Sequence, residues 1–334
     1  MRAVVYQRRG DAAKVLKVVD LPDPEPDTGE VKVRIVTSGI NPSDVKSRAG
    51  ASAEQSGRDD PLPFPYQVPH QDGAGIIEGV GPEVDPALMG TAVWVYNAAF
   101  KRQHGTAADF VCLPREQVVP LPAGVPMGLG AGLGIPFITA HRCLLAGGDI
   151  AGATVLVTGG AGAVGNAAVQ LARFHEAKVL ATVSSEQKAE IARAAGAHAT
   201  IDYRADDVAV RLRALAPEGV DRVVDVSLTT NLPSYFDTLN SHAEVAAYAE
   251  SPGAVGPAWP PPMQLRVRNV LLRFVRAYGL TVPMVDAALA DINRALHADA
   301  LRPLPEQRFP LEEVAAAHEA VEQGAVGKVL LELG

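Results

Sequence analysis

The sequence predicts an α/β fold with two domains, one mostly β and one built on a doubly wound parallel sheet. The chain has 334 residues, which is too long for one ordinary hydrophobic core. Up to about residue 125 it is rich in β-branched residues, Gly and Pro, and short apolar runs alternate as in half-buried strands. From about residue 126 helical and strand patterns take turns, as in βαβ units.

In the first part, residues 1–6 predict an initial strand and residues 31–36 a second, half-buried one. Residues 51–63 are polar and predict a mobile surface loop. In the second part we expect strands at 153–158, 177–183, 221–226 and 243–248, with helices at 164–175 and 186–195. Residues 252–263, rich in proline, predict a loop that crosses between domains. Helices at 284–297 and 311–323 and a strand at 327–333 follow.

A glycine-rich turn between a strand and a helix is the most informative motif. The apolar run Val155–Thr158 leads into it, and the helix follows from Asn166. Gly159 is expected to adopt angles closed to other residues, Gly162 to admit a pyrophosphate, and Gly165 to let the helix pack on the strand. Free N–H groups at the helix start would face the anion. The alternative is an ordinary tight turn, but the second strand at the right distance favours a dinucleotide site.

The tip of that second strand indicates which dinucleotide is bound. NAD sites usually place Asp or Glu there, whereas this chain has Ser184 and Ser185, with Lys188 one turn further on. Hydroxyls and a lysine suit a 2′-phosphate, so we expect NADPH as the cofactor. Glu186 is the complication, and we interpret it as a solvent-facing residue of the helix's first turn.

Composition excludes several classes of protein. Hydrophobic content of 48% with 20% charged residues is typical of a soluble globular enzyme, and the net charge of −8 argues against a general nucleic-acid surface. No apolar run approaches the ~20 residues of a membrane span, and the N-terminus lacks a signal-peptide pattern, so a cytoplasmic location is expected. Two cysteines, Cys112 and Cys143, allow neither a disulfide framework nor a four-cysteine zinc site.

Several motifs in order carry a resemblance to a known family. They are Asn41-Pro42-Ser43-Asp44, residues 71–81, the glycine turn, Asp202-Tyr203-Arg204, and Gly327-Lys328-Val329-Leu330. Over essentially its whole length the chain resembles the medium-chain dehydrogenase/reductase superfamily, in its zinc-free NADPH:quinone oxidoreductase branch, which includes zeta-crystallin. The resemblance implies a GroES-like catalytic domain from residues 1–125 with 265–334, and a Rossmann domain at 126–264. It also implies a cofactor in the cleft between them and a homodimer formed through the Rossmann sheet edges.

Zinc-dependent relatives place Cys where this chain has Asn41, and His where it has Gln71. The region expected to supply a further Cys reads Gly134-Ile135-Pro136. Because catalytic zinc needs thiolate or imidazole ligands, we expect no metal. His70 stands one residue early, and we interpret it as a structural residue or a hydrogen-bonding group of the pocket.

The resemblance assigns cofactor contacts to residues in both domains. Asn41 and Thr139 would lie at the nicotinamide end, and Tyr203 near the adenosine, although Tyr203 is nearly as well explained as a strand-end aromatic. Lys328 would close the site from the C-terminal segment, with a surface lysine before a strand as the alternative. The remaining expected contacts are Gly159, Ala161, Gly162, Ala163, Val164, Gly165, Ser184, Ser185, Lys188, Ala247, Tyr248 and Ala249.

The candidate catalytic residues are Asn41 and Lys46. Asn41 would donate to the substrate carbonyl or to the nicotinamide ribose, and would also cap the turn before Pro42. Lys46 stands where many quinone oxidoreductases have Tyr, so it either binds a substrate oxygen or the nicotinamide end, or is a solvated helix lysine. Asp44, His70 and Tyr96 are expected in the substrate pocket, Tyr96 having the alternative of an ordinary strand aromatic.

These features predict NADPH-dependent reduction of a quinone. Without a Lewis acid the acceptor must already be activated, and no paired acid and base stands out, so solvent is expected to supply the proton. One alternative is a reductase of alkenals, enones or enoyl thioesters. For long acyl thioesters Arg266, Arg268, Arg273 and Arg276 would provide an anchor, unless they form a solvated face. Another alternative is a non-catalytic NADPH-binding protein, of a crystallin-like or RNA-binding kind.

Overall fold

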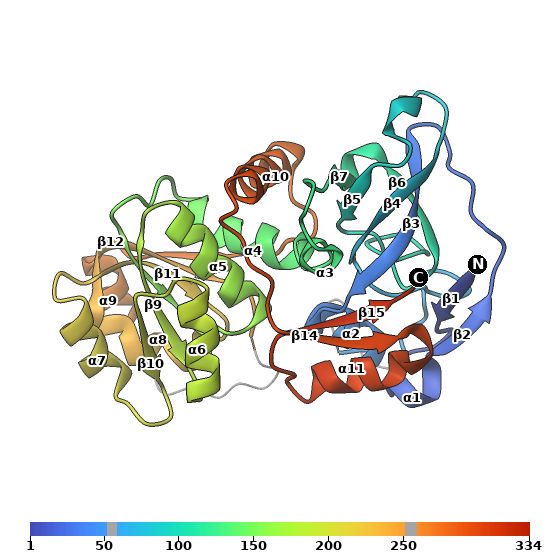
Figure 1. Cartoon of the computed structure of the whole chain (residues 1–334). Coiled ribbons are helices and arrows are strands. Elements are labelled where there is room, and N and C mark those ends of the chain that lie inside the picture. The colour runs from blue at the N-terminus through green and yellow to red at the C-terminus, as the bar shows by residue number, and fades with distance from the viewer. Residues whose placement is uncertain (52–58, 251–258) are drawn as a thin grey trace. The chain divides into compact units, whose positions relative to one another are not determined.

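The structure, a computed structural model of residues 1–334, describes residues 1–51, 59–250 and 259–334 (Figure 1). The chain forms two compact units: residues Met1–Ile135 with Pro303–Gly334, and residues Pro136–Arg302. The expected fold class, a mostly-β GroES-like domain and a parallel-sheet domain, is confirmed. Within the described residues no helix is long and apolar enough to cross a membrane.

The first unit is built on a mixed sheet in the order β14-β15-β3-β4-β5-β7, with β6 paired to β3. These strands are β3 (Glu30–Gly39), β4 (Asp72–Val80), β5 (Ala92–Val95), β6 (Phe110–Pro114), β7 (Val118–Pro120), β14 (Glu306–Pro310) and β15 (Lys328–Glu332). A separate pair joins β1 (Arg2–Val5) to β2 (Lys17–Asp20). The short helices are α1 (Ala12–Val15), α2 (Pro42–Ala49), α3 (Met127–Gly130) and α11 (Val314–Glu322). Alternate residues of β3, Val31, Val33 and Ile35, lie in the core of this unit.

The second unit contains six parallel strands in the order β10-β9-β8-β11-β12-β13. They are β8 (Thr154–Val157), β9 (Lys178–Val183), β10 (Ala199–Asp202), β11 (Val220–Asp225), β12 (Leu239–Ala247) and β13 (Leu271–Phe274). Strand order reverses beside β8, the first strand of the sheet along the chain. Ligands of doubly wound sheets bind at the carboxyl ends of strands at such a point, and the glycine-rich turn follows β8.

Helices cover both faces of this sheet. The helices are α4 (Gly134–Leu145), α5 (Ala163–Phe174), α6 (Glu186–Ala194), α7 (Val208–Leu215), α8 (Leu228–Tyr235), α9 (Pro262–Val267) and α10 (Val282–His297). Leu156, Leu180 and Val223 point from the strands into a core shared with α7 and α8. In Figure 1, α5 and α6 lie in front of the strands.

The residue at which the chain returns to the first unit differs from the one expected from the sequence. We expected it at residue 265, but residues 265–302 belong to the second unit and the return is at Pro303. The reason is β13, which pairs in parallel with β12 through Glu244–Leu271 to Ala247–Phe274 and extends the sheet by one strand. Most of the loops expected at 51–63 and 252–263 lies outside the described residues.

Candidate functional site

Three of the four glycines in the glycine-rich turn, Gly159, Gly162 and Gly165, differ in their backbone surroundings. Gly159 has φ of 69°, in the left-handed region, and its N–H donates to Thr182 Oγ1 at 3.1 Å. A Cβ on Gly165 would lie 2.2 Å from the carbonyl oxygen of Gly159, which no side chain tolerates. Gly162 is exposed, and a Cβ there would meet nothing closer than 3.4 Å. Of these three glycines only Gly162 is exposed, as a residue beside a ligand would be.

Helix α5 begins directly after Gly162, which stands at its N-cap and supplies no side-chain acceptor. The first N–H groups of a helix have no partner within the helix, and the helix dipole makes this end positive. The turn residues Ala161, Ala163 and Val164 lie at this end. The arrangement suits an anionic group such as a pyrophosphate.

The tip of β9 brings together the residues expected to bind a phosphate. Lys188 Nζ donates to Ser184 Oγ at 3.1 Å, and Ser185 Oγ accepts from the backbone N–H of Lys188 at 3.4 Å as the N-cap of α6. Glu186 is exposed and forms an ion pair with Arg193, as expected of a solvent-facing residue. Tyr203 follows β10, whose last residue pairs with Val183, and its side chain is 52% exposed. Hydroxyl, ammonium and aromatic groups thus lie at the carboxyl ends of the neighbouring strands β9 and β10.

The other residues expected near the cofactor in this unit lie on α4 and at the end of β12. Thr139 is buried in α4, and Ala247 ends β12, with half-buried Tyr248 and Ala249 directly after it. The backbone N–H of Tyr248 donates to the Asp225 carbonyl at 3.1 Å, which continues the pairing of β12 with β11.

Asp225, at the end of β11, is a residue that the sequence analysis missed. It is fully buried, and its carboxylate accepts from Thr158 Oγ1 at 3.1 Å, from the N–H of Ser227 at 2.8 Å and from Tyr235 Oη at 2.5 Å. Burial, followed by the negative charge of Asp225 and by this last hydrogen bond, raises the pKa of the Tyr235 phenol well above its usual value. Asp225 thereby fixes the loop after β11 to the residue that precedes the glycine turn. A carboxylate ending a buried strand was the available signal in the sequence.

In the first unit the candidate residues form a buried polar cluster around Asn41. Its amide is held at both ends: Nδ2 donates to Asp72 Oδ2 at 2.7 Å, and Oδ1 accepts from Lys328 Nζ at 2.8 Å. The backbone N–H of Asn41 donates to Asp44 Oδ2 at 2.8 Å. Asn41, Asp44, Asp72 and Lys328 are all at most 5% exposed. The cluster fixes which way the Asn41 amide points.

The ionisable groups of this cluster are strongly perturbed. Burial, with the neighbouring Asp72 carboxylate, raises the pKa of Asp44 to about 7. Burial also raises the pKa of Asp72 to about 6, opposed by the Lys328 ammonium, and it lowers the pKa of Lys328. One buried cation thus faces two carboxylates, and the second carboxylate holds a proton near neutrality.

His70 lies in a hydrogen-bonded chain that runs into this cluster. His318 Nε2 contacts His70 Nε2 at 2.9 Å, His70 Nδ1 contacts Ser38 Oγ at 2.9 Å, and Ser38 Oγ contacts Thr106 Oγ1 at 2.7 Å. Thr106 donates to the carbonyl oxygen of Asp72 at 2.7 Å. Because a carbonyl only accepts, Ser38 must donate to Thr106, His70 Nδ1 to Ser38, and His318 Nε2 to His70. Both ring nitrogens of His70 are therefore engaged inside the protein.

Lys46 and Tyr96 are the two remaining candidate residues of the first unit. Lys46 is half-buried on α2, where its carbonyl oxygen accepts from the N–H of Ala51 at 2.8 Å. Tyr96 is 5% exposed and donates its hydroxyl to the carbonyl of Glu116 at 2.9 Å. The hydroxyl of Tyr96 is thus engaged by the protein backbone.

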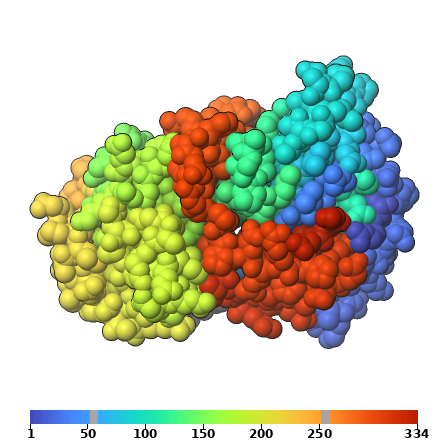
Figure 2. Space-filling model, viewed as in Figure 1, coloured from blue at the N-terminus to red at the C-terminus, as the bar shows by residue number. Residues whose placement is uncertain are grey.

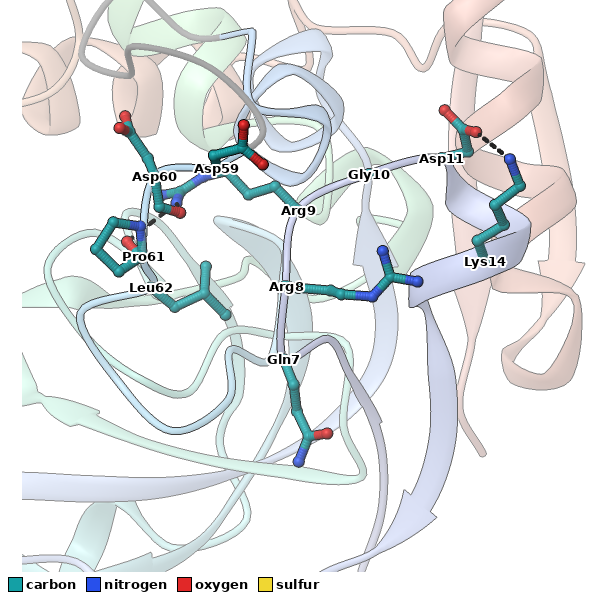
Figure 3. A pocket seen from close by; sticks show the side chains of 10 residues that line it. All are labelled: Gln7, Arg8, Arg9, Gly10, Asp11, Lys14, Asp59, Asp60, Pro61 and Leu62. Atoms are coloured by element: carbon teal, nitrogen blue, oxygen red, sulfur yellow. Dashed lines mark hydrogen bonds and ion pairs between the residues drawn. The ribbon is translucent and has the colours of Figure 1, made fainter.

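A pocket of about 470 Å³ in the first unit is lined by none of the predicted site residues (Figure 3). It lies between residues 7–14 and residues 59–62. Lys14 there pairs with Asp11 at 2.8 Å, and Arg9 donates to the carbonyl oxygen of Pro61 at 3.0 Å. The lining also includes the charged residues Arg8, Asp59 and Asp60, but no residue expected at the functional site lies among them.

The residues around Asn41 do not fit a catalytic zinc ion. Among the described residues, no group of three His, Cys, Asp or Glu side chains is arranged to hold a metal. At Asn41, the Lys328 ammonium contacts the amide oxygen, so a cationic side chain already lies on the atom that would be a ligand. Cys143 is buried, and burial raises the pKa of its thiol above the usual range, whereas zinc binds the thiolate.

Comparison with known proteins places the whole chain. Residues 27–123 match the family described as alcohol dehydrogenase GroES-like domain, and residues 195–331 match zinc-binding dehydrogenase. A quinone oxidoreductase of Lama guanicoe is 30% identical over 99% of this chain and 97% of its own length. The solved quinone oxidoreductase of Thermus thermophilus, also determined with NADPH, is 28% identical with a TM-score of 0.80 over all of both chains. A solved NAD-dependent alcohol dehydrogenase is 29% identical with a TM-score of 0.86, again over all of both chains.

Identity along nearly the full length, agreement of both units with solved structures, and the strand order around the glycine turn all lead to one assignment. The chain belongs to the quinone oxidoreductases of the medium-chain dehydrogenase/reductase superfamily.

Proposed function

We propose that this protein reduces quinones with NADPH and without zinc. The observation that carries the proposal lies at the carboxyl ends of β8 and β9 in the second unit. The exposed Gly162 follows β8, and the Lys188–Ser184 pair follows the adjacent strand β9. A pyrophosphate would bind at the start of α5, and the 2′-phosphate would bind to Ser184 and Lys188.

The names of the relatives point to both nicotinamide cofactors, since one similar structure is called NAD-dependent and another was solved with NADPH. The chain's own residues favour NADPH. A site for the ribose 2′-hydroxyl of NAD usually offers a carboxylate at the strand tip. Here the strand tip offers the Ser184 hydroxyl and the Lys188 ammonium, both suited to a phosphate.

When bound, NADPH would supply the reducing electrons, and the protein would supply positioning and hydrogen bonds. Asn41 is the proposed donor to the acceptor's carbonyl oxygen or to the nicotinamide ribose. One hydrogen of its Nδ2 is committed to Asp72, which leaves the second for a ligand. With no Lewis acid at the carbonyl, the acceptor must stabilise the developing oxyanion by delocalisation, as quinones do.

The test is NADPH consumption with a simple quinone and with a simple enone, each repeated with NADH, on protein analysed for metal. We expect turnover on the quinone with NADPH and less than stoichiometric zinc. Turnover on the enone alone would place the protein among double-bond reductases. Binding of NADPH without turnover on either acceptor would favour a non-catalytic role, and one zinc per chain would overturn the zinc-free chemistry.

The structure lends little support to a long acyl-thioester substrate. Of the four arginines that would anchor it, Arg273 is paired with Glu244 at 2.5 Å, and Arg268 with Asp237 at 3.5 Å. Arg276 lies over the ring of Tyr278 at 5.3 Å, so three of the four arginines are engaged within the second unit.

We also propose that the protein forms a homodimer through β13. Among the described strands β13 pairs only with β12, so its other edge carries unpaired backbone groups. Apolar side chains stand exposed on and beside it: Val267 at 71%, Leu271 at 48% and Phe274 at 75%. Pairing of two such edges would bury this patch and extend the sheet across both copies.

A further inference from the structure

Glu186 stands where a carboxylate should oppose NADPH. It is the first residue of α6, two positions after Ser184 at the tip of β9. A carboxylate at this tip is the usual partner of the ribose 2′-hydroxyl in NAD sites, and it repels a 2′-phosphate. The chain thus combines a phosphate-binding pair, Ser184 and Lys188, with a residue of the opposite preference.

The structure shows how this conflict is resolved. Arg193 Nη2 donates to Glu186 Oε1, and Arg193 Nη1 donates to Thr200 Oγ1 on β10 at 3.1 Å. Thr200 thereby holds the guanidinium in place from a neighbouring strand. Lys188, by contrast, makes its side-chain hydrogen bond with Ser184 and none with Glu186. The Glu186 carboxylate is thus paired with the Arg193 guanidinium, while the Lys188 ammonium stays hydrogen-bonded to Ser184.

We propose that Arg193 strengthens the preference for NADPH by neutralising and holding Glu186. Arg193 is a positioning residue that acts through Glu186. This inference deepens the proposed function and rests on it. Without Arg193, Glu186 would be free to repel the 2′-phosphate, to compete for Lys188, or to accept a hydrogen bond from the 2′-hydroxyl of NADH. The cofactor preference would then shift toward NADH.

The expected size of the effect is set by exposure. The Glu186 side chain is 75% exposed and that of Arg193 44%, and the surface of α6 faces the viewer in Figure 2, coloured yellow-green. Ion pairs between exposed side chains are screened by water and salt. We therefore expect a two- to five-fold change in the ratio of the two dissociation constants, larger at low salt.

The experiment is fluorescence titration of the full-length protein with NADPH and with NADH at low and physiological salt. At low salt R193A should raise the Kd for NADPH two- to five-fold and leave the Kd for NADH unchanged or lower, and this difference should shrink at physiological salt. The double variant E186Q/R193A should return the ratio to the wild-type value, because the unmatched carboxylate is gone. R211A removes one positive charge from α7 and should leave the ratio unchanged, and melting curves check that each variant is folded.

Different outcomes separate the two proposals. If wild-type protein binds NADPH but R193A changes both constants equally, or changes neither, Arg193 has no role in cofactor preference while the proposed function stands. Failure of E186Q/R193A to restore the ratio would also overturn the inference, since the effect would then not run through Glu186. If wild-type protein binds neither cofactor, the proposed function fails and this inference falls with it.

Discussion

Lys328 and Asn41 come from opposite ends of the sequence, and a hydrogen bond of 2.8 Å joins Nζ of the lysine to Oδ1 of the asparagine. Pairing of β15 with β3 creates this contact, because it places the start of β15 beside the residues that follow β3: the N–H of Ile40 donates to the carbonyl of Val329 at 3.1 Å. The C-terminal strand thus completes the surroundings of a candidate catalytic residue near the N-terminus. Lys328 also donates to the carbonyl of Ile40 at 3.1 Å, so it fixes both the amide and the backbone beside it.

Removal of the Lys328 charge should destabilise the first unit. K328M removes the buried donor to the Asn41 amide oxygen and to the Ile40 carbonyl oxygen, and a buried acceptor left without a partner costs about 1–3 kcal/mol. It also removes the positive charge that acts on the buried Asp72 and Asp44 carboxylates. Urea denaturation of wild type and variant measures this loss. K328M/D72N should recover part of it, because the neutral amide needs no cation. Equal stability of wild type and K328M would mean that the ammonium does not balance these carboxylates.

The sequence predicted some members of this cluster and missed others for a definable reason. Asn41, Asp44 and Lys328 stand in recognisable motifs, and the resemblance pointed to them. Asp72 lies in such a motif as well, but its role depends on strand register: Gly39 of β3 pairs with Asp72 of β4, which sets the carboxylate beside Asn41. His318 carries no local signal, since only the packing of α11 brings it to His70.

The second unit was more predictable because its signals are local. Five of the strand and helix ranges expected between residues 153 and 226 agree with β8, α5, β9, α6 and β11 to within two residues. Strand β13 was missed because its sequence, Leu-Leu-Arg-Phe at residues 271–274, does not alternate between apolar and polar residues. It is a short edge strand that exposes apolar side chains. The expected boundary at residue 265 was wrong for the same reason, since β13 keeps the residues up to Arg302 in the second unit.

The two buried histidines should make the protein less stable in acid. Burial is the main cause that lowers the pKa of His318 to about 3, and it lowers the pKa of His70 well below the usual value. Because the pKa of each histidine is lowered in the folded state, the unfolded chain binds more protons than the folded chain below pH 6.5. The free energy of unfolding therefore decreases as the pH decreases. For His318 alone the loss is roughly 3 kcal/mol at pH 4.

The difference between wild type and H70Q/H318Q isolates this effect. Asp44 and Asp72, whose pKa values are raised, act in the opposite sense: their contribution to stability is greatest in acid and is lost as pH rises from about 4 to 7. Chemical denaturation of both proteins from pH 4 to 8 gives the difference between their free energies of unfolding. The contributions of Asp44 and Asp72 cancel in this difference, because both proteins contain them. The advantage of wild type over the variant should shrink as pH falls below 6.5, and a constant difference would mean that neither histidine resists protonation.

Two glycines of the β8–α5 turn should respond differently to one added methyl group. In G165A the Cβ would meet the Gly159 carbonyl oxygen at 2.2 Å, so the turn must distort and the melting temperature should fall by several degrees. In G162A the Cβ has room in the free protein, so stability should change little while NADPH affinity falls at least ten-fold from contact with the pyrophosphate. Thermal melts paired with cofactor titration separate these effects. Unchanged NADPH affinity in G162A would place the pyrophosphate elsewhere.

Lys188 should matter for NADPH far more than for NADH. Its ammonium lies 3.1 Å from Ser184 Oγ, and only NADPH carries the 2′-phosphate that both groups would bind. K188A should raise the Kd for NADPH about ten-fold or more, as loss of one charge-assisted contact does, and leave NADH within two-fold. K178A removes a lysine from the opposite end of β9 and serves as the control for charge. Equal weakening of both cofactors would show that Lys188 does not bind the 2′-phosphate.

The exposed edge of β13 predicts the oligomeric state. If two copies pair through this edge, Phe274, at 75% exposure, becomes buried, and an aspartate there would carry an unpaired charge into the interface. Wild-type protein should sediment as a dimer and F274D as a monomer, with the same melting profile at the secondary-structure level. V210D places the same charge on α7, where Val210 is 56% exposed away from β13, and should remain dimeric. A wild-type monomer, or an F274D dimer, would mean that this apolar edge is not the surface through which the copies meet.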